Sequence, residues 1–136
     1  VPSFIEAFEA SYPMTLGYSG PAHIICDRLF LSRILTNLLR NAVIAQATHM
    51  QVDIWSAGHL LVIDFSDNGP GIEPARKADL FAPFAASSRA GSGLGLSICL
   101  DLALALGGKF FLSRSNEAGS EFRLQLPAIP AYLPKV

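Results

Sequence analysis

The sequence has little charge, few cysteines and no long uninterrupted apolar run, and each shortage excludes a class of protein. Only 15% of its 136 residues are charged and the formal net charge is -1, so we expect no surface for nucleic acid or for an anionic membrane. The longest apolar candidate, Leu94 to Leu106, is interrupted by Ser97 and Asp101 and is shorter than the roughly 18 residues of a membrane helix. Cys26 and Cys99 lack the spacing of a metal site or a CxxC motif, which favours two reduced core cysteines.

The apolar content is high enough for a folded domain. Apolar residues make up 51% of the chain, which argues against disorder, and 136 residues suit one domain with a single core. We expect one domain over 1–136, with its core at about 14–127 and a Pro-rich tail at 128–136. The chain begins at Val1 without a basic segment, so no signal peptide is visible, and the lack of an initiator Met suggests a piece of a longer protein.

Periodicity and turn residues predict a mixture of helices and strands. Apolar residues at helical spacing predict a long helix from the N-cap Asp27 to about Ala47. A second helix is expected over 93–106, ended by Gly107 and Gly108. Strands are expected at 14–18, 22–26, 51–57, 60–67, 109–115 and 120–126, short helices at 4–12 and 73–80, and a loop at 85–92. Because strict βαβ alternation is missing, this order predicts an α/β sandwich, with one mixed sheet and helices on one face.

A carboxylate stands where the predicted strand 60–67 ends. Alternate residues of a strand share a face, and those that share the face of Asp67 are Leu61, Ile63 and Phe65. A carboxylate on that core-side face needs hydrogen-bond donors, and the amino group of a ligand is one candidate. The alternative is an ordinary turn, because Asp67-Asn68-Gly69 is a common turn tripeptide.

Two asparagines lie one turn apart in the long predicted helix. Asn37 and Asn41 are spaced i, i+4 on a face that also carries Ile34 and Leu38. Asn is a poor helix former and needs hydrogen-bond partners when it is buried. Its carbonyl oxygen is also a hard ligand that suits Mg²⁺, which takes few protein ligands. The alternative is that neighbouring backbone groups satisfy both side chains.

A glycine-rich turn, Gly91 to Ser97, opens the second long helix. Backbone N–H groups and the helix dipole favour anions at such a start, and glycines let the main chain approach a phosphate closely. The turn alone is weak support, since it matches neither the dinucleotide-binding pattern nor the P-loop, and the H-R-D signature of protein kinases is absent. Together with the Asn pair and Asp67, it predicts a site for adenine, a metal ion and phosphates.

These features resemble, in this order, the GHKL ATPase superfamily and, within it, the sensor histidine kinases. The resemblance covers about 24–127. Its motifs are the N box with its lead-in at 25–42, the first glycine box at 67–72, the F box at 80–84, the second glycine box at 91–98, and the closing strands around Gly107-Gly108 and Gly119 to Phe122. The resemblance implies a two-layer sandwich of the Bergerat type with a mostly antiparallel sheet.

The resemblance also implies ATP and Mg²⁺ as ligands. Asp67 would accept a hydrogen bond from the adenine amino group, and Gly69, Gly71 and Ile72 would form the wall of the adenine pocket.

The same resemblance assigns a second group of residues to the phosphates. Asn41 would hold Mg²⁺ and Asn37 would lie close to the phosphates, as the catalytic pair. The backbone amides expected to meet phosphate belong to Gly91, Gly93, Leu94, Gly95 and Leu96. Residues 85–92 would form the mobile lid, with Phe81 and Phe84 at its base.

The chain departs from the family pattern at two phosphate contacts. Many members carry a basic and an aromatic residue just after the second Asn, where this chain has Val43, Ile44 and Ala45; it resembles instead the variant found in nitrogen-regulation-type kinases. The usual lid Lys aligns with Ser88, and Arg89 is expected to replace it one position later.

The phosphoacceptor region of a histidine kinase is missing. None of His23, His49 and His59 has the acidic neighbour of an acceptor His, so all three are predicted to be ordinary histidines. The leading hypothesis is therefore the cytoplasmic ATP-binding catalytic domain of a sensor kinase, whether free or as part of a membrane-bound sensor. It would transfer the γ-phosphoryl group of ATP to a histidine on a separate dimerisation domain, with a response regulator as an indirect partner.

Alternative functions stay open at this point. The main one is a degenerate kinase-like module that binds a response regulator or dimerises without ATP turnover. Topoisomerase, mismatch-repair and chaperone relatives fit less well, because their ATP domains feed a following transducer domain. An anti-sigma-factor kinase is closer in size, but it phosphorylates a Ser on a partner protein.

Overall fold

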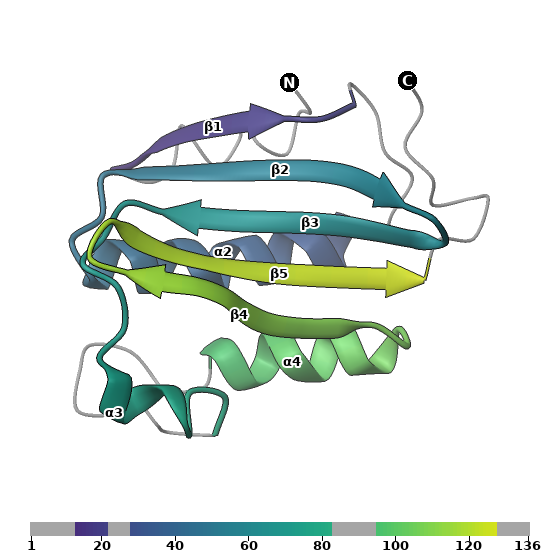
Figure 1. Cartoon of the computed structure of the whole chain (residues 1–136). Helices are drawn as coiled ribbons and strands as arrows, with labels where there is room; N and C mark the ends of the chain where they lie inside the picture. The colour runs from purple at the N-terminus through teal and green to yellow at the C-terminus, as the bar shows by residue number, and fades with distance from the viewer. Residues whose placement is uncertain (1–12, 22–27, 83–94, 128–136) are drawn as a thin grey trace.

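The computed structural model describes residues 13–21, 28–82 and 95–127 and shows a five-stranded sheet with helices on one face (Figure 1). In chain order the elements are β1 (Thr15–Ser19), α2 (Arg28–Ile44), β2 (His49–Ala57), β3 (Leu60–Asp67), α3 (Pro74–Lys77), α4 (Gly95–Ala105), β4 (Lys109–Asn116) and β5 (Gly119–Pro127). The sequence expectations for 4–12, 22–26, Asp27, 85–92 and 128–136 lie outside the described residues.

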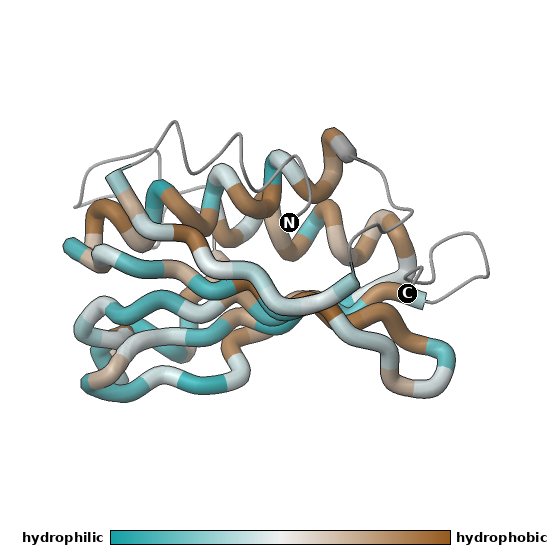
Figure 2. Tube along the Cα trace, turned by 90° about the horizontal axis from the view of Figure 1, so that it is seen from above, coloured by the Kyte–Doolittle hydropathy of each residue, from teal (hydrophilic) through white to brown (hydrophobic). Residues whose placement is uncertain are grey.

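The strands lie in the order β1-β2-β3-β5-β4. β1 runs parallel to β2, and every other neighbouring pair is antiparallel. Seen from above, α2 and α4 lie side by side over one face of the sheet (Figure 2). The expected two-layer, mostly antiparallel α/β sandwich is confirmed.

The core fills the space between these helices and the inner face of the sheet. From α2 it takes Ile34, Leu35 and Leu39, and from the sheet Leu61, Ile63 and Leu124, none of them more than 1% exposed. Burial of each such side chain is worth about 1.5–3 kcal/mol, so this layer fixes α2 against the sheet.

Cys99 of α4 belongs to the same layer. Its Sγ lies 3.9 Å from the carbonyl oxygen of Ile34, and burial raises the pKa of the thiol to about 12. The expectation of a reduced core cysteine is confirmed for Cys99, while Cys26 lies outside the described part of the chain.

α2 ends at Ile44. The prediction that it ends near Ala47 was wrong by three residues. Gln46 adopts a left-handed conformation with φ 65°. Its N–H donates to the carbonyl of Val43 at 3.0 Å, and the N–H of Ala47 donates to the carbonyl of Ala42 at 2.9 Å. This pair of bonds is a Schellman motif, which satisfies the last carbonyls of the helix and turns the chain toward β2.

The other helix boundaries agree with the prediction to different degrees. α4 ends as expected, with Gly107 at φ 74° and the N–H of Gly108 bonded to the carbonyl of Ala103 at 2.9 Å. The predicted helix over 73–80 is helical only at Pro74–Lys77. α4 covers Gly95–Ala105, and its predicted start at residue 93 lies outside the described residues. No helix in the described ranges is long and apolar enough to cross a membrane.

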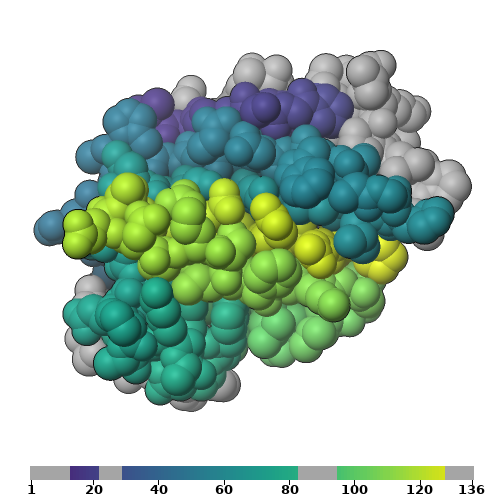
Figure 3. Space-filling view, viewed as in Figure 1, coloured from purple at the N-terminus to yellow at the C-terminus, as the bar shows by residue number. Residues whose placement is uncertain are grey.

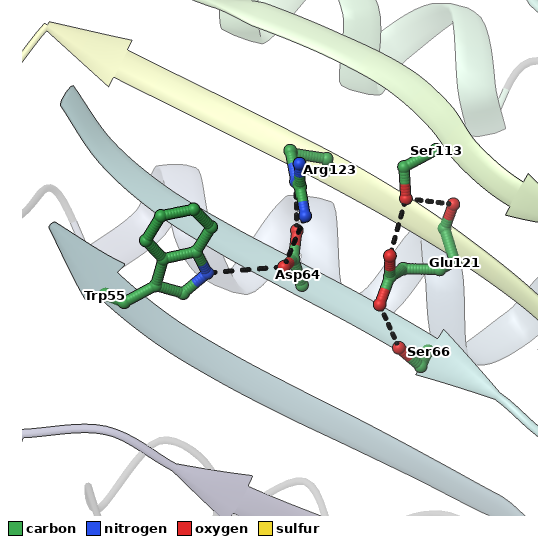
Figure 4. A network of polar contacts seen from close by, with 6 residues as sticks. All are labelled: Trp55, Asp64, Ser66, Ser113, Glu121 and Arg123. Atoms are coloured by element: carbon green, nitrogen blue, oxygen red, sulfur yellow. Dashed lines mark hydrogen bonds and ion pairs between the residues drawn. The ribbon is translucent and has the colours of Figure 1, made fainter. Parts of the chain in front are cut away.

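The outer face of the sheet is covered by its own side chains, with no described helix over it (Figure 3). Asp64 of β3 is only 6% exposed on this face, because Arg123 of β5 donates to its two oxygens at 2.7 and 3.1 Å (Figure 4). Trp55 of β2 donates from Nε1 to the same carboxylate at 3.3 Å. The hydrogen bond to Asp64 raises the pKa of Arg123, because it favours the charged guanidinium.

A second group on the outer face joins three strands. The two carboxylate oxygens of Glu121 accept hydrogen bonds from Ser66 at 2.9 Å and from Ser113 at 2.7 Å (Figure 4). These polar residues lie on the face opposite α2 and α4, and the site described next does not include them.

Candidate functional site

The end of β3 is tied to the end of α2 by the side chain of Asn68. Its Oδ1 accepts hydrogen bonds from the backbone N–H groups of Thr48 at 2.8 Å and His49 at 2.9 Å. Its Nδ2 donates to the Thr48 hydroxyl at 2.9 Å. These hydrogen bonds therefore fix the position of the turn after β3 relative to the segment that follows α2.

Asp67 stands at the end of β3, as predicted, and it makes the turn that was the alternative interpretation of this residue. Its Oδ1 accepts a hydrogen bond from the N–H of Gly69 at 2.9 Å, which is an Asx turn. The residue is half-buried, and among the described residues its Oδ2 has no hydrogen-bond partner. The carboxylate thus makes the turn with one of its two oxygens.

The turn after Asp67 packs on the residues that directly follow α2. A Cβ added at Gly69 would lie 3.6 Å from the Cβ of Ala47 and 3.7 Å from that of Ala45. The N–H of Ala45 bonds to the carbonyl of Asn41 at 3.0 Å, so Asn41 lies one helical turn from this contact. Asp67 and Asn41 therefore belong to the same end of the molecule, as the sequence predicts.

The two asparagines differ in their surroundings. Asn37 is half-buried and donates from Nδ2 to the carbonyl of Arg33 at 2.9 Å, so neighbouring backbone satisfies this part of its amide. Asn41 is also half-buried, and its side chain makes no hydrogen bond to another described residue. Of the two side chains, only that of Asn37 makes a hydrogen bond to another described residue.

The start of α4 lies against Asn37. A Cβ added at Gly95 would stand 3.3 Å from the Asn37 Oδ1, so the absence of a side chain allows this approach. Leu96 follows on the helix, half-buried and packed against the core. The structure thus brings Gly95 of the second glycine box to the asparagine helix, while Phe84, Arg89, Gly91, Gly93 and Leu94 lie outside the residues it describes.

The opposite side of the site is formed by the hairpin between β4 and β5. Gly71 has φ 84°, and a Cβ there would overlap the carbonyl oxygen of Asn116. Gly119 has φ 141°, and a Cβ there would overlap the carbonyl oxygen of Asp67. Ile72, whose side chain packs against the core, donates its N–H to the Ser115 hydroxyl at 2.8 Å.

Phe81 is held by aromatic neighbours rather than by the site. It meets Phe110 and Phe122 edge-on, with ring centroids 5.8 and 6.3 Å apart. Its predicted place at the base of the lid stays a prediction, because the lid residues are not described.

The side chains of the two described histidines are exposed to solvent. His49 is exposed and its Nδ1 lies 2.7 Å from the Thr48 hydroxyl, and His59 is exposed in the hairpin between β2 and β3. That they are ordinary histidines stays a prediction from the sequence.

A groove between α2 and α4 lies away from this site. It is lined by Leu29, Phe30, Arg33, Leu102, Ala105 and Leu106, from the first turns of α2 and the last turns of α4. Asn41 and Gly95 come from the opposite ends of the same two helices, so the groove does not belong to the site.

Sequence reasoning missed the residues that hold the site together. Ser115 had no recognisable signal, because its partner Ile72 is 43 residues away in the sequence. Asn68 and Gly119 were noted as parts of motifs, but the backbone groups they contact become visible only in the fold.

Comparison with known proteins agrees with this geometry. Residues 26–130 match the family model described as histidine kinase-, DNA gyrase B-, and HSP90-like ATPase. The Escherichia coli sensor protein TorS is 35% identical over 117 residues, which cover 84% of this chain and 13% of that protein. The Streptomyces coelicolor histidine-protein kinase AfsQ2 is 39% identical over 114 residues, covering 80% of this chain and 21% of that protein.

Solved structures show the same fold. Full-length ShkA in complex with AMPPNP superposes with a TM-score of 0.76 at 25% identity, covering 98% of this chain and 29% of that one. The catalytic domain of histidine kinase ThkA gives a TM-score of 0.73 at 25% identity, covering 93% of this chain and 86% of that domain. The chain therefore belongs to the histidine kinase-, DNA gyrase B- and HSP90-like ATPase family, as a catalytic domain of the sensor histidine kinase type.

Proposed function

We propose that this domain binds Mg-ATP at the end of the sheet and supplies the γ-phosphoryl group to a histidine on a separate dimerisation domain. The observation that supports this most is the convergence of three elements at one place. Asp67 ends β3, Asn41 lies one helical turn before the residues after α2 that contact the β3 turn, and Gly95, the first described residue of α4, lies against Asn37. Phosphoryl transfer requires positioning and charge neutralisation more than covalent chemistry, and these elements offer both.

The adenine side of the site is proposed for the turn after β3. The unpaired Oδ2 of Asp67 is a hydrogen-bond acceptor at the mouth of the core, which suits the amino group of adenine. Gly69, Gly71 and Ile72 form the wall beside it, and the two glycines keep this wall free of side chains. Among the undescribed residues, Phe84 is proposed to close this wall on sequence grounds.

The phosphate side is proposed for α2 and the start of α4. The free amide oxygen of Asn41 fits Mg²⁺, which keeps most of its waters and takes one or two protein ligands. When bound, Mg²⁺ would neutralise phosphate charge. Asn37 and the backbone amides of Gly95 and Leu96 would orient the phosphates, joined by residues 91, 93, 94 and Arg89.

The relatives support the proposal that the phosphoryl acceptor is a histidine, since one is a sensor protein and the other a histidine-protein kinase. The chain spans 13% and 21% of the two relatives described above, so the acceptor histidine, the dimerisation domain and the response regulator are proposed to lie outside it. We further propose a single domain with its core at about 14–127, a tail at 128–136 and a cytoplasmic location, where ATP is available.

A second function is favoured by one observation. The last turn of α2 contains no basic residue, and Ile44 is 37% exposed there. A degenerate module that binds a response regulator without ATP turnover would tolerate such a loss of positive charge beside the phosphates.

Calorimetry separates the two functions. Wild-type protein should bind ATP and ADP, and chelation of Mg²⁺ should weaken ATP binding. At about 100 times its dissociation constant, a nucleotide should add about 2.7 kcal/mol to the free energy of unfolding. An unchanged melting temperature at saturating Mg-ATP would favour the degenerate module.

A labelling experiment tests where the acceptor lies. The isolated chain should not take up radioactive phosphate from ATP, because an in-line nucleophile is needed and no acceptor-like His is present. Acid-labile phosphate on His23, His49 or His59 would contradict the proposal.

A further inference from the structure

We propose that Ser115 of β4 is a positioning residue for the adenine side of the site. Its hydroxyl holds the loop from Gly69 to Ile72 against the β4–β5 hairpin. The inference rests on the proposed binding of adenine nucleotides, and it adds a residue that belongs to none of the recognised motifs.

The Ser115 hydroxyl is itself held in place. It accepts the N–H of Ile72 at 2.8 Å and lies 3.2 Å from the hydroxyl of Ser120, which is buried on β5. A hydroxyl has one proton and two lone pairs, so Ser115 can accept from Ile72 and share the other bond with Ser120. The anchored oxygen is therefore a fixed acceptor rather than a rotating surface group.

The loop lies directly on the hairpin, with no side chain between them. A Cβ at Gly71 would overlap the carbonyl oxygen of Asn116 and stand 3.1 Å from the Ser115 Oγ. Because Gly71 allows this close approach, the bond from Ile72 to Ser115 sets how near the loop stands to β4. If that bond is lost, the loop can lift from the hairpin into the space proposed for adenine.

The β4–β5 hairpin contacts the segment from Asp67 to Ile72 at both ends of that segment. Gly119, at the start of β5, contacts the carbonyl oxygen of Asp67, and Ser115, at the end of β4, binds Ile72. The acceptor carboxylate and the pocket wall are thus positioned by one hairpin. Ser115 itself lies behind the wall, so it acts through Gly71 and Ile72.

The same strand offers a matched control. Ser113 also has a bound hydroxyl, but its partners are the carboxylate of Glu121 at 2.7 Å and the Glu121 carbonyl at 3.2 Å. Ser113→Ala removes a hydroxyl from β4 without touching the loop.

The test compares ATP and ADP affinities by calorimetry with the exchange rate of the Ile72 amide by NMR. Ser115→Ala should raise both dissociation constants by the same factor, about three- to tenfold, because the two nucleotides share adenine. The Ile72 amide should exchange faster without nucleotide. Ser113→Ala should change neither quantity, and Ser115→Thr, which keeps the hydroxyl, should restore both. If Ser115→Ala does not fold, Ser115→Cys keeps the volume with a weak acceptor and should shift both in the same direction.

Each result decides between distinct claims. Wild-type affinity in Ser115→Ala or Ser115→Cys, with the wild type binding ATP, overturns the positioning role. A loss for ATP alone, with ADP unchanged, also overturns it, because the effect would then lie at the γ-phosphate. A wild type that binds neither nucleotide refutes the proposed function itself, and the positioning role with it.

Discussion

Exchange of Asp67 for Asn tests the adenine assignment while it leaves the turn intact. The amide keeps an oxygen that can accept the Gly69 N–H, which Oδ1 now accepts at 2.9 Å. The other carboxylate oxygen becomes an NH₂ group, which donates where the adenine amino group requires an acceptor. The free energy of unfolding should therefore change by less than about 0.5 kcal/mol.

The mismatch between two donors sets the size of the effect. An unsatisfied polar group in a partly buried site costs about 1–3 kcal/mol, so the dissociation constant for ATP should rise about five- to 150-fold. ADP should lose the same factor. A purine nucleotide that lacks the 6-amino group should bind the wild type and Asp67→Asn about equally, because it has no donor to mismatch.

Calorimetry on three proteins suffices for this test. Asp53→Asn is the matched control: its carboxylate lies on β2, accepts from Gln51 at 2.9 Å, and is remote from the turn. Unchanged ATP binding by Asp67→Asn would refute the adenine assignment. An equal loss for the nucleotide without the amino group would show that the substitution acts through the fold instead.

Four further predictions follow from particular contacts. Gly119→Ala should lower the free energy of unfolding in urea by about 1–3 kcal/mol, because its Cβ would overlap the Asp67 carbonyl, whereas Gly58→Ala, at φ 59° with open space around it, should lose less. Arg123→Ala should cost about 1–3 kcal/mol by leaving the buried Asp64 carboxylate without its guanidinium, and Arg114→Ala, which is exposed, should cost little; equal losses would contradict this. In a Cys26→Ser background, Cys99 should resist a thiol reagent at pH 8 until urea unfolds the protein. Since its pKa is raised from 9.0 to about 12, the native state keeps a proton that the unfolded state loses, so its contribution to stability is full below pH 9 and falls between pH 9 and 12. Arg89→Ala should weaken ATP more than ADP, and equal affinities of both proteins for both nucleotides would remove Arg89 from the site.

Local patterns predicted the elements well because local physics decides them. The strand Leu60–Asp67 and the glycine end of α4 follow from branched residues and from a residue type suited to positive φ. The end of α2 was missed because the left-handed residue that ends it is Gln46. A glycine at this position would have indicated the helix end in the sequence. The Schellman bonds that stabilise it involve backbone groups, which leave no mark on the sequence.

Contacts between residues far apart in the sequence could not be predicted from local patterns. Asp67, Asn41 and Gly95 were expected together on the strength of the motifs, but nothing local shows that Ser115 receives the Ile72 N–H. The burial of Asp64 could not be foreseen either, since its partner Arg123 is 59 residues away on a strand whose place in the sheet was unknown. Strand order is a property of the whole chain, and it decides which side chains meet.

The position of β5 has a consequence for how the domain is made. The last strand of the described chain is inserted between β3 and β4, where it pairs Asp67 with Ser120 and Leu60 with Pro127. During synthesis β3 therefore keeps one edge open until β5 leaves the ribosome, and open strand edges invite pairing with other chains. Because β5 is an inner strand, termination before β5 would do more than remove one edge strand from the sheet. It would separate β4 from β1, β2 and β3, and leave two fragments of a sheet with exposed edges.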